Sequence, residues 1–272
     1  MKVFISADIE GISGVVSKAH TTSEGYDYQR ARMLMTQEVN AAILGALDAG
    51  AEEILVNDAH GSMTNILIEE LNPKASLISG TPKMLGMMEG IDDSFDAALF
   101  IGYHSRMNSS GVLSHTYHGA VVSDITINGK PSGEFYINAS VAGSFGVPVV
   151  LVSGDDVLEK EVHAINGDIE SVVVKNALGR YAAKCMAPLH ARNLIRERTK
   201  EALRQADQMT ITRTEGPVEL KITFLNSGYA QVASLMPGTT LAEPNVIAYT
   251  AENIVECYQA VMALIKVAAT LL

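Results

Sequence analysis

The chain alternates short, uniformly apolar runs with longer segments of helical periodicity, and this alternation strongly limits the folds open to it. Strands are predicted at residues 3–7, 54–57, 76–79, 97–102, 147–153 and 171–175, and helices at 26–48, 132–145, 155–164 and 188–205. Runs that are apolar throughout are typical of parallel strands buried on both faces. The sequence therefore predicts an α/β fold, a mainly parallel sheet with helices on both faces.

The pattern changes after about residue 209. Residues 219–225 and 246–249 indicate two further strands, and residues 251–272 indicate a long terminal helix. Earlier in the chain, residues 121–127 have moderate strand character and are followed by Asn128-Gly129, a good type I′ hairpin turn. We expect an α/β metal-binding catalytic domain at residues 1–209 and a small α+β subdomain at residues 210–272.

The charge balance excludes several kinds of partner. The chain has 20 basic and 31 acidic residues, a net charge of −11, which disfavours both nucleic acid and an anionic membrane. The apolar stretch 260–272 is shorter than the roughly 20 residues that a bilayer requires, and Lys266 interrupts it. Cys185 and Cys257 form no CxxC pattern, and the first residues do not resemble a signal peptide. These features predict a cytoplasmic protein.

Side chains of the kind that bind metal ions follow three of the predicted strands. Asp8 and Glu10 follow the first strand, His60 follows the second, and His104 follows the run at 97–102. Carboxyl ends of parallel strands meet at one edge of a sheet, about 4.8 Å apart, so these side chains are expected to converge. Mixed oxygen and nitrogen ligands suit zinc or another divalent transition metal. A carboxylate shared between two ions, here Asp8, would give a dinuclear site.

Each residue also has a simpler explanation when it is considered alone. A strand-end aspartate such as Asp8 or Asp58 is often a helix cap or a turn residue, and Glu10 alone would suit a solvated loop. Glu134 begins a predicted helix, where the macrodipole favours an acidic residue, so spacing alone does not make it a ligand. His115 suits acid–base chemistry but equally suits a surface loop. The joint occurrence at three strand ends is harder to attribute to chance and favours a metal site.

The segment Ser6-Ala7-Asp8-Ile9-Glu10-Gly11 resembles the SxDxEG signature of the zinc-dependent D-aminopeptidase family. The similarity continues through residues 56–60, 102–104, 114–115, 133–134, 153–156 and 235–239. It therefore extends over essentially the whole chain.

The resemblance implies a set of ligands and a reaction. It assigns His115 as the catalytic histidine and five metal ligands, with Asp8 shared by two zinc ions: Asp8, Glu10, His60, His104 and Glu134. It implies removal of an N-terminal residue, such as D-alanine, from short peptides or amides. It also implies a homo-oligomer, a ring-based decamer with sites facing an internal chamber. The loop between His115 and Glu134 contains a further histidine, His118. The resemblance therefore does not define the substrate pocket.

On this interpretation, two zinc ions acidify a water molecule and the resulting hydroxide attacks the scissile carbonyl. His115 then serves as general acid and base, although a nucleophilic role for it stays open. Two other functions also stay open. A dinuclear hydrolase of phosphate esters or non-peptide amides would want a cation near the metals, for which Arg106 and Lys18 are the candidates. A non-catalytic metal-binding assembly protein is the other alternative.

Overall fold

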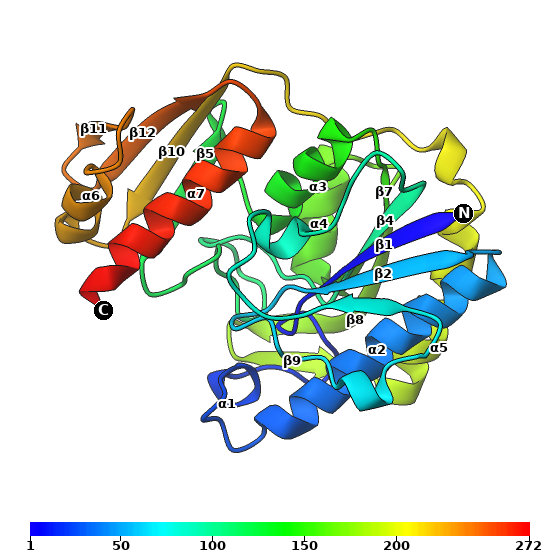
Figure 1. Ribbon diagram of the computed structural model, residues 1–272. Coiled ribbons are helices and arrows are strands. Elements are labelled where there is room, and N and C mark those ends of the chain that lie inside the picture. The colour runs from blue at the N-terminus through cyan, green and yellow to red at the C-terminus, as the bar shows by residue number, and fades with distance from the viewer.

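The computed structural model describes residues 1–272 and contains two β-sheets (Figure 1). Neighbouring strands of the larger sheet are parallel except for the last pair, which is antiparallel. Its seven strands lie in the order β3 (Ser76–Ile78), β2 (Glu53–Asp58), β1 (Lys2–Ala7), β4 (Ala97–Ile101), β7 (Val149–Asp155), β8 (Glu170–Gly179) and β9 (Ala182–Cys185). The predicted parallel α/β sheet is confirmed.

Helices cover both faces of this sheet. Side chains alternate between the two faces of a strand, and because these strands are apolar throughout, both faces must be buried. Val3 and Ile5 of β1 belong to a buried cluster with α2 (Tyr28–Asp48) and α5 (Pro188–Leu203). Phe4, between them, belongs to a second cluster with α3 (Glu134–Ser144) and α4 (Asp156–Ile165). The uniformly apolar strand sequence thus fills two cores at once.

The smaller sheet is antiparallel and draws on two distant parts of the chain. Its strands lie in the order β11 (Thr240–Glu243), β12 (Val246–Ala251), β10 (Val218–Phe224), β5 (Val122–Ile127) and β6 (Lys130–Pro131). Residues 210–272 therefore do not build this sheet alone: β5 and β6 complete it from within the segment assigned to the first domain. The hairpin at Asn128-Gly129 is confirmed, with φ of 50° and 74° at its two residues.

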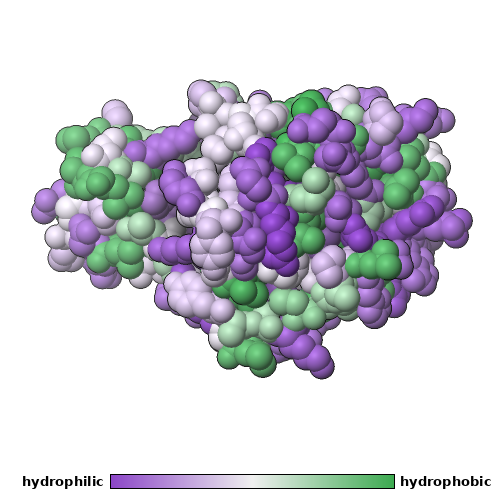
Figure 2. All heavy atoms as spheres, turned by 90° about the horizontal axis from the view of Figure 1, so that it is seen from below, coloured by the Kyte–Doolittle hydropathy of each residue, from purple (hydrophilic) through white to green (hydrophobic).

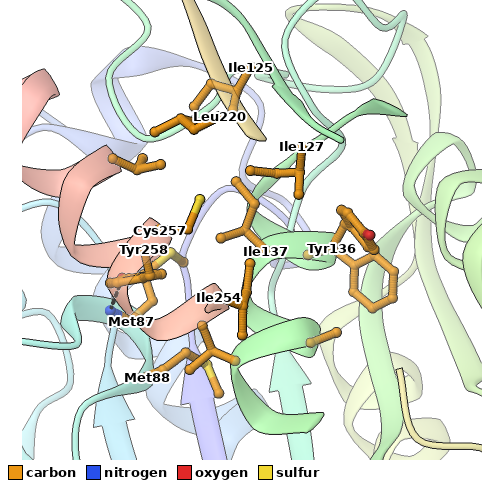
Figure 3. Packing of buried hydrophobic residues seen from close by; sticks show 14 of the residues in the cluster. Met87, Met88, Ile125, Ile127, Tyr136, Ile137, Leu220, Ile254, Cys257 and Tyr258 are labelled. Atoms are coloured by element: carbon orange, nitrogen blue, oxygen red, sulfur yellow. Dashed lines mark hydrogen bonds between the residues drawn. The ribbon is translucent and has the colours of Figure 1, made fainter. Parts of the chain in front are cut away.

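One hydrophobic cluster joins the two sheets. It contains Phe4 of β1, passes through α3, and includes Ile125 and Leu220 of the smaller sheet. Figure 3 shows Ile125 and Leu220 in this cluster together with Ile254, Cys257 and Tyr258 of α7 (Ile254–Ala268). The second sheet and α7 are consequently fixed against the layer that carries the strand ends.

Several predicted boundaries are wrong by a few residues, for identifiable reasons. The helix predicted from Ser132 begins at Glu134, with Gly133 at the N-cap, because the Ser132 hydroxyl donates to the carbonyl of Lys130 instead. The terminal helix begins at Ile254, since β12 continues to Ala251. The prediction lacked β9, β11 and two short helices, α1 (Lys18–Thr21) and α6 (Ser227–Ala233). The 3-10 turns are η1 (Ile68–Glu70), η2 (Gly86–Met88), η3 (Ala206–Gln208) and η4 (Ala269–Leu271).

One helical segment, Ile254–Leu271, has the length and hydropathy of a membrane span. Its inner face is buried against the protein through Tyr258, Val261 and Leu264. Figure 2 shows that, on the face seen from below, apolar residues form separate patches among hydrophilic ones. We interpret the segment as a core helix.

Candidate metal centre

The candidate site lies at the centre of the larger sheet, where the chain changes direction across it. From β1 the chain proceeds outward to β2 and β3, and then returns to form β4 on the other side of β1. Ligand sites in open parallel sheets lie outside the carboxyl ends of the strands at such a point. Asp8, His60 and His104 follow three neighbouring strands there, β1, β2 and β4.

Two glycines allow the ends of β1 and β4 to approach closely. The amide of Gly11 donates to the carbonyl of Gly102 at 2.7 Å. A Cβ atom on Gly11 would lie 1.9 Å from the Tyr103 carbonyl oxygen, and one on Gly102 would lie 2.2 Å from that of Asp8. Gly102 also has φ of +72°, which disfavours other residues. The last position of the SxDxEG segment, Gly11, therefore requires glycine for steric reasons.

The structure brings all five predicted ligand residues together. His60 Nδ1 lies 2.9 Å from Glu10 Oε2 and 3.2 Å from Asp8 Oδ1. His104 Nε2 lies 3.4 Å from both Asp8 Oδ2 and Glu134 Oε1. None of these side chains is more than 12% exposed. The two oxygens of Asp8 thus face different histidines.

The histidine rings are held with one nitrogen directed into the cluster. His60 Nε2 lies 2.7 Å from the carbonyl oxygen of Thr21, and His104 Nδ1 lies 3.0 Å from that of Ser105. A carbonyl only accepts, so each of these outer nitrogens carries the hydrogen and donates it. When the inner nitrogen gives up its proton, as metal binding requires, its lone pair is directed into the cluster.

The cluster has the chemistry of a cation site. Glu10 Oε2 and His104 Nε2 are buried and make no hydrogen bond. Their burial without a partner is costly, and a cation among them would supply one. Two groups of ligand atoms, from Asp8, Glu10 and His104 and from His104, His115 and Glu134, each lie within 4.8 Å of one another. Mixed carboxylate and imidazole donors at these separations fit zinc.

The carboxylates dominate the electrostatics of the cluster. Burial and the neighbouring Glu10 raise the pKa of Asp8 to about 7. Burial lowers the pKa of His104, but Glu134 and Asp8 outweigh it and raise this pKa to about 10. Glu10 and Asp8 likewise hold the pKa of His60 well above its usual value despite burial. The site therefore favours positive charge.

His115 lies beside the cluster on a strained loop. Leu113 and Tyr117, two residues to either side, have φ of 54° and 56°, in the left-handed region. The His115 ring stacks on that of His104 with centroids 4.2 Å apart, and its Nδ1 lies 2.9 Å from the Leu113 carbonyl oxygen. Its Nε2 faces Glu134 Oε1 at 4.0 Å. Burial, and then His104, lower the pKa of His115, which favours a neutral ring able to accept a proton.

Glu134 is the first residue of α3, two residues after the predicted start at Ser132, and it does not cap that helix. Its Oε1 accepts from the backbone amide of Tyr117 at 2.6 Å and faces the two histidines described above. The carboxylate thus points into the cluster. Spacing alone could not separate these two roles.

Comparison with known proteins identifies the family. The D-aminopeptidase family matches residues 1–263. The chain belongs to the D-aminopeptidase family. It is 40% identical over 270 residues to the D-aminopeptidase of Bacillus subtilis (strain 168), with 98% of each chain covered. A solved structure, the Zn-dependent D-aminopeptidase DppA from Bacillus subtilis, described as a self-compartmentalizing protease, superposes with a TM-score of 0.96. The identity there is 39%, covering 99% of this chain and 98% of the other.

The family assignment makes the chain a hydrolase of the peptidase class and confirms the predicted family, fold class and enzyme class. It also favours an aminopeptidase over the two alternatives. Neither of the two cations predicted for the phosphate-ester alternative, Arg106 and Lys18, lines the cavity at the cluster.

That cavity has a volume of about 230 Å³, and its walls include Asp8, His60, His115 and Glu134. His118 also lines it, and the Nδ1 atom of His118 is buried with no hydrogen-bond partner. A larger cavity of about 560 Å³ lies between α4, β6 and residues 210–213 and contains none of the predicted site residues. The smaller cavity is therefore the candidate substrate site of this D-aminopeptidase.

Asp58, which also ends a strand, has the structural role that a strand-end aspartate often has. Its carboxylate accepts from the backbone and side-chain amides of Asn65 at 2.5 and 2.7 Å and from the amide of Ile66 at 2.7 Å. The Asn65 side chain also donates to the carbonyl of His60 at 2.6 Å. Asp58 thus shapes the loop that carries a ligand without facing the cluster.

Lys175 of β8 was missed by sequence reasoning. It is fully buried, and its Nζ donates to the carbonyl oxygens of Glu10, Ile12 at 3.1 Å and Val15 at 2.6 Å. These three carbonyls belong to the loop that follows β1. A lysine directly after the apolar run Val172–Val174 was the signal available in the sequence.

We expect Lys175→Met to lower the free energy of unfolding by about 3–5 kcal/mol, because it removes a buried charge and leaves three carbonyls without a donor. Urea denaturation of the metal-free protein measures the effect. Lys184→Met, on the exposed neighbouring strand β9, is the matched control and should change stability by less than about 0.5 kcal/mol. A loss below about 1 kcal/mol for Lys175→Met would contradict the role described here.

Proposed function

We propose that this D-aminopeptidase removes the N-terminal residue, a D-amino acid such as D-alanine, from short peptides or amides, using two zinc ions held by the cluster. The observation that carries the proposal is the orientation of Asp8. Its Oδ1 faces His60 and its Oδ2 faces His104. A carboxylate can bridge two ions through its two oxygens, whereas one imidazole nitrogen serves a single ion.

The ligands then divide into two sets that share Asp8. Glu10 and His60 would hold one ion with Asp8, and His104 and Glu134 would hold the other. His115, whose Nε2 also lies near Glu134, is assigned to proton transfer. Zinc is supported as the metal by the Zn-dependence of the related solved structure. The D-configuration of the substrate is supported by the activity for which the relatives are named.

The proposed chemistry combines bound metal with the chain's own groups. Two zinc ions would supply a nucleophile from water near neutral pH and polarise the scissile carbonyl. The net charge of −11 of the chain as a whole attracts the N-terminal ammonium of the substrate. His115 accepts a proton at Nε2 and returns it to the leaving amine, while the Leu113 carbonyl holds Nδ1–H.

The cavity supports a small substrate. Its volume of about 230 Å³ is below the range of roughly 300–1,000 Å³ typical of sites for drug-sized ligands. Met63 and Met87 contribute apolar wall beside the cluster. A peptide of two or three small residues fits these dimensions better than a folded chain.

Removal of metal tests the proposal. Dialysis against a chelator should reduce turnover to below about 1%, because both the nucleophile and carbonyl polarisation depend on the metal, and added Zn²⁺ should restore it. Elemental analysis of the restored protein should find two zinc ions per chain. The assay compares D- and L-aminoacyl amides with a phosphate ester. Full activity without metal, or stoichiometric zinc without hydrolysis of any aminoacyl amide, would overturn the proposal.

We also propose that the chain assembles into a homo-oligomer, a ring-based decamer. The related structure is of a self-compartmentalizing protease. Large apolar side chains are well exposed on the single chain, among them Leu178 and Leu235, each 76% exposed. Burial of such side chains favours association. Light scattering of the purified protein measures the number of chains, and a monomer would contradict this proposal.

A further inference from the structure

We infer that Lys266 of α7 binds the C-terminal carboxylate of the substrate, so that the enzyme selects short peptides with a free C-terminus. The inference rests on the proposed function and narrows its substrate class. It assigns Lys266 as a specificity-determining residue of the same cavity.

One wall of the cavity comes from α7, which is far from the ligand residues in the sequence. Met262, Ile265 and Lys266 line the same cavity as Asp8 and Glu134. Lys266 is the only lysine or arginine among the lining residues. The cavity therefore combines the candidate metal site, an apolar wall and a single ammonium group, which suits a short peptide that presents its scissile bond to the metals and its free carboxylate to Lys266.

Lys266 has no partner within the protein. Its side chain forms no ion pair and no hydrogen bond with another residue of the chain. Lys266 is exposed, and other exposed lysines such as Lys74 and Lys184 also lack a partner, so its position in the cavity lining is what distinguishes it. An unpaired ammonium at the wall of a substrate cavity is available to a ligand carboxylate, and such charge-assisted contacts are among the stronger polar ones.

The helix that carries Lys266 is anchored to the site. The hydroxyl of Tyr258, two turns earlier on α7, accepts from the amide of Met87 at 3.0 Å. The carbonyl of Met87 accepts in turn from Ser6 of β1 at 2.8 Å. Figure 3 shows Tyr258 and Met87 side by side in the core, joined by a dashed line. This chain of contacts fixes α7 relative to the strand that carries Asp8.

Electrostatics give Lys266 a role in binding a free peptide. The proposed function commits Asp8, Glu10 and Glu134 to the metal ions, and the chain as a whole has a net charge of −11, which repels the substrate's carboxylate. Without Lys266, no lysine or arginine lines the cavity to oppose that repulsion, and the site would favour peptides whose C-terminus is blocked as an amide. Lys266 reverses that preference.

Lys266 also lies in the last turn of α7, where a cation offsets the helix dipole. That structural role would affect stability, but it would affect all substrates equally. Discrimination between a free and a blocked C-terminus is therefore the readout that separates the two roles.

The test compares D-alanyl-D-alanine with D-alanyl-D-alanine amide. Zinc-loaded enzyme should have a kcat/KM about tenfold higher for the free acid, mainly through KM, and Lys266→Met should reduce this preference to within twofold while hydrolysis of the amide is retained. Lys266→Arg should keep the preference. Lys74→Met, which removes an exposed charge remote from the cavity lining, should leave both values unchanged.

Calorimetric titration of both probes into zinc-loaded His115→Ala protein measures binding without turnover. Tighter binding of the free acid that is lost on adding Lys266→Met would support the role of Lys266. If the wild-type enzyme nevertheless hydrolysed neither probe, only the proposed function would be contradicted. Equal binding of the two probes, or an equal loss for both in Lys266→Met, would overturn the inference even if hydrolysis proceeded.

Discussion

Replacing Asp8 by alanine should abolish both zinc binding and turnover. Its two carboxylate oxygens face the two histidines on either side, so its loss opens both proposed metal sets at once. Metal ions contribute several kcal/mol of transition-state stabilisation, and each 1.4 kcal/mol is a factor of ten in rate. We therefore expect kcat/KM to fall by at least about 10³-fold and zinc content to fall from two ions towards none, measured by steady-state kinetics and elemental analysis.

Asp48→Ala is the matched control for this variant. Asp48 is an aspartate on the exposed surface of α2, where it pairs with Arg196 at 2.7 Å, far along the chain from the site residues. It should retain two zinc ions and full turnover. A folded Asp8→Ala protein, judged by circular dichroism, that kept its full zinc content would show that Asp8 does not bridge the metals.

The strand-end argument succeeded where topology alone decides the geometry. Asp8, His60 and His104 each follow a strand of the parallel sheet, and their convergence depends only on neighbouring strands sharing a direction. The apolar runs that define these strands are visible in the sequence. The positions of these residues could therefore be predicted without knowledge of any loop.

Glu134 and His115 depended on the resemblance, because their placement is decided by contacts that no local pattern records. Glu134 opens a helix, where a capping role and a ligand role have the same sequence signature. Its direction is fixed by the amide of Tyr117, on a loop whose left-handed residues are not glycines. The wall formed by α7 was equally hidden, since it requires the second sheet to pack against the first.

The division of the chain into domains also depends on contacts that no local sequence pattern records. The strands after residue 209 belong to the second sheet, and the domain boundary near that residue stays a prediction. That sheet nevertheless takes β5 and β6 from residues 122–131. Which strand pairs with which in an antiparallel sheet is decided by tertiary packing. The local sequence pattern of a strand does not record that packing.

Replacing His115 by alanine should separate chemistry from metal binding. His115 Nε2 lies 4.0 Å from Glu134 but takes no part in the two ligand sets around Asp8, so the variant should keep two zinc ions. General acid–base groups contribute about 10²–10⁴-fold, and we expect kcat to fall within that range with a smaller change in KM. His163→Ala, on the exposed surface of α4, is the control and should leave kcat unchanged.

The same variant distinguishes proton transfer from nucleophilic attack. If His115 moves protons, added imidazole should partly restore turnover, and mass spectrometry of rapidly quenched wild-type enzyme should find no acylated protein. An acyl group on His115 would instead make it the nucleophile. The hydrogen bond from Nδ1 to the Leu113 carbonyl leaves a lone pair on Nε2 for either role, so the geometry defines the reacting atom while the quench experiment decides what that atom does. Unchanged kcat in His115→Ala would remove this residue from the reaction altogether.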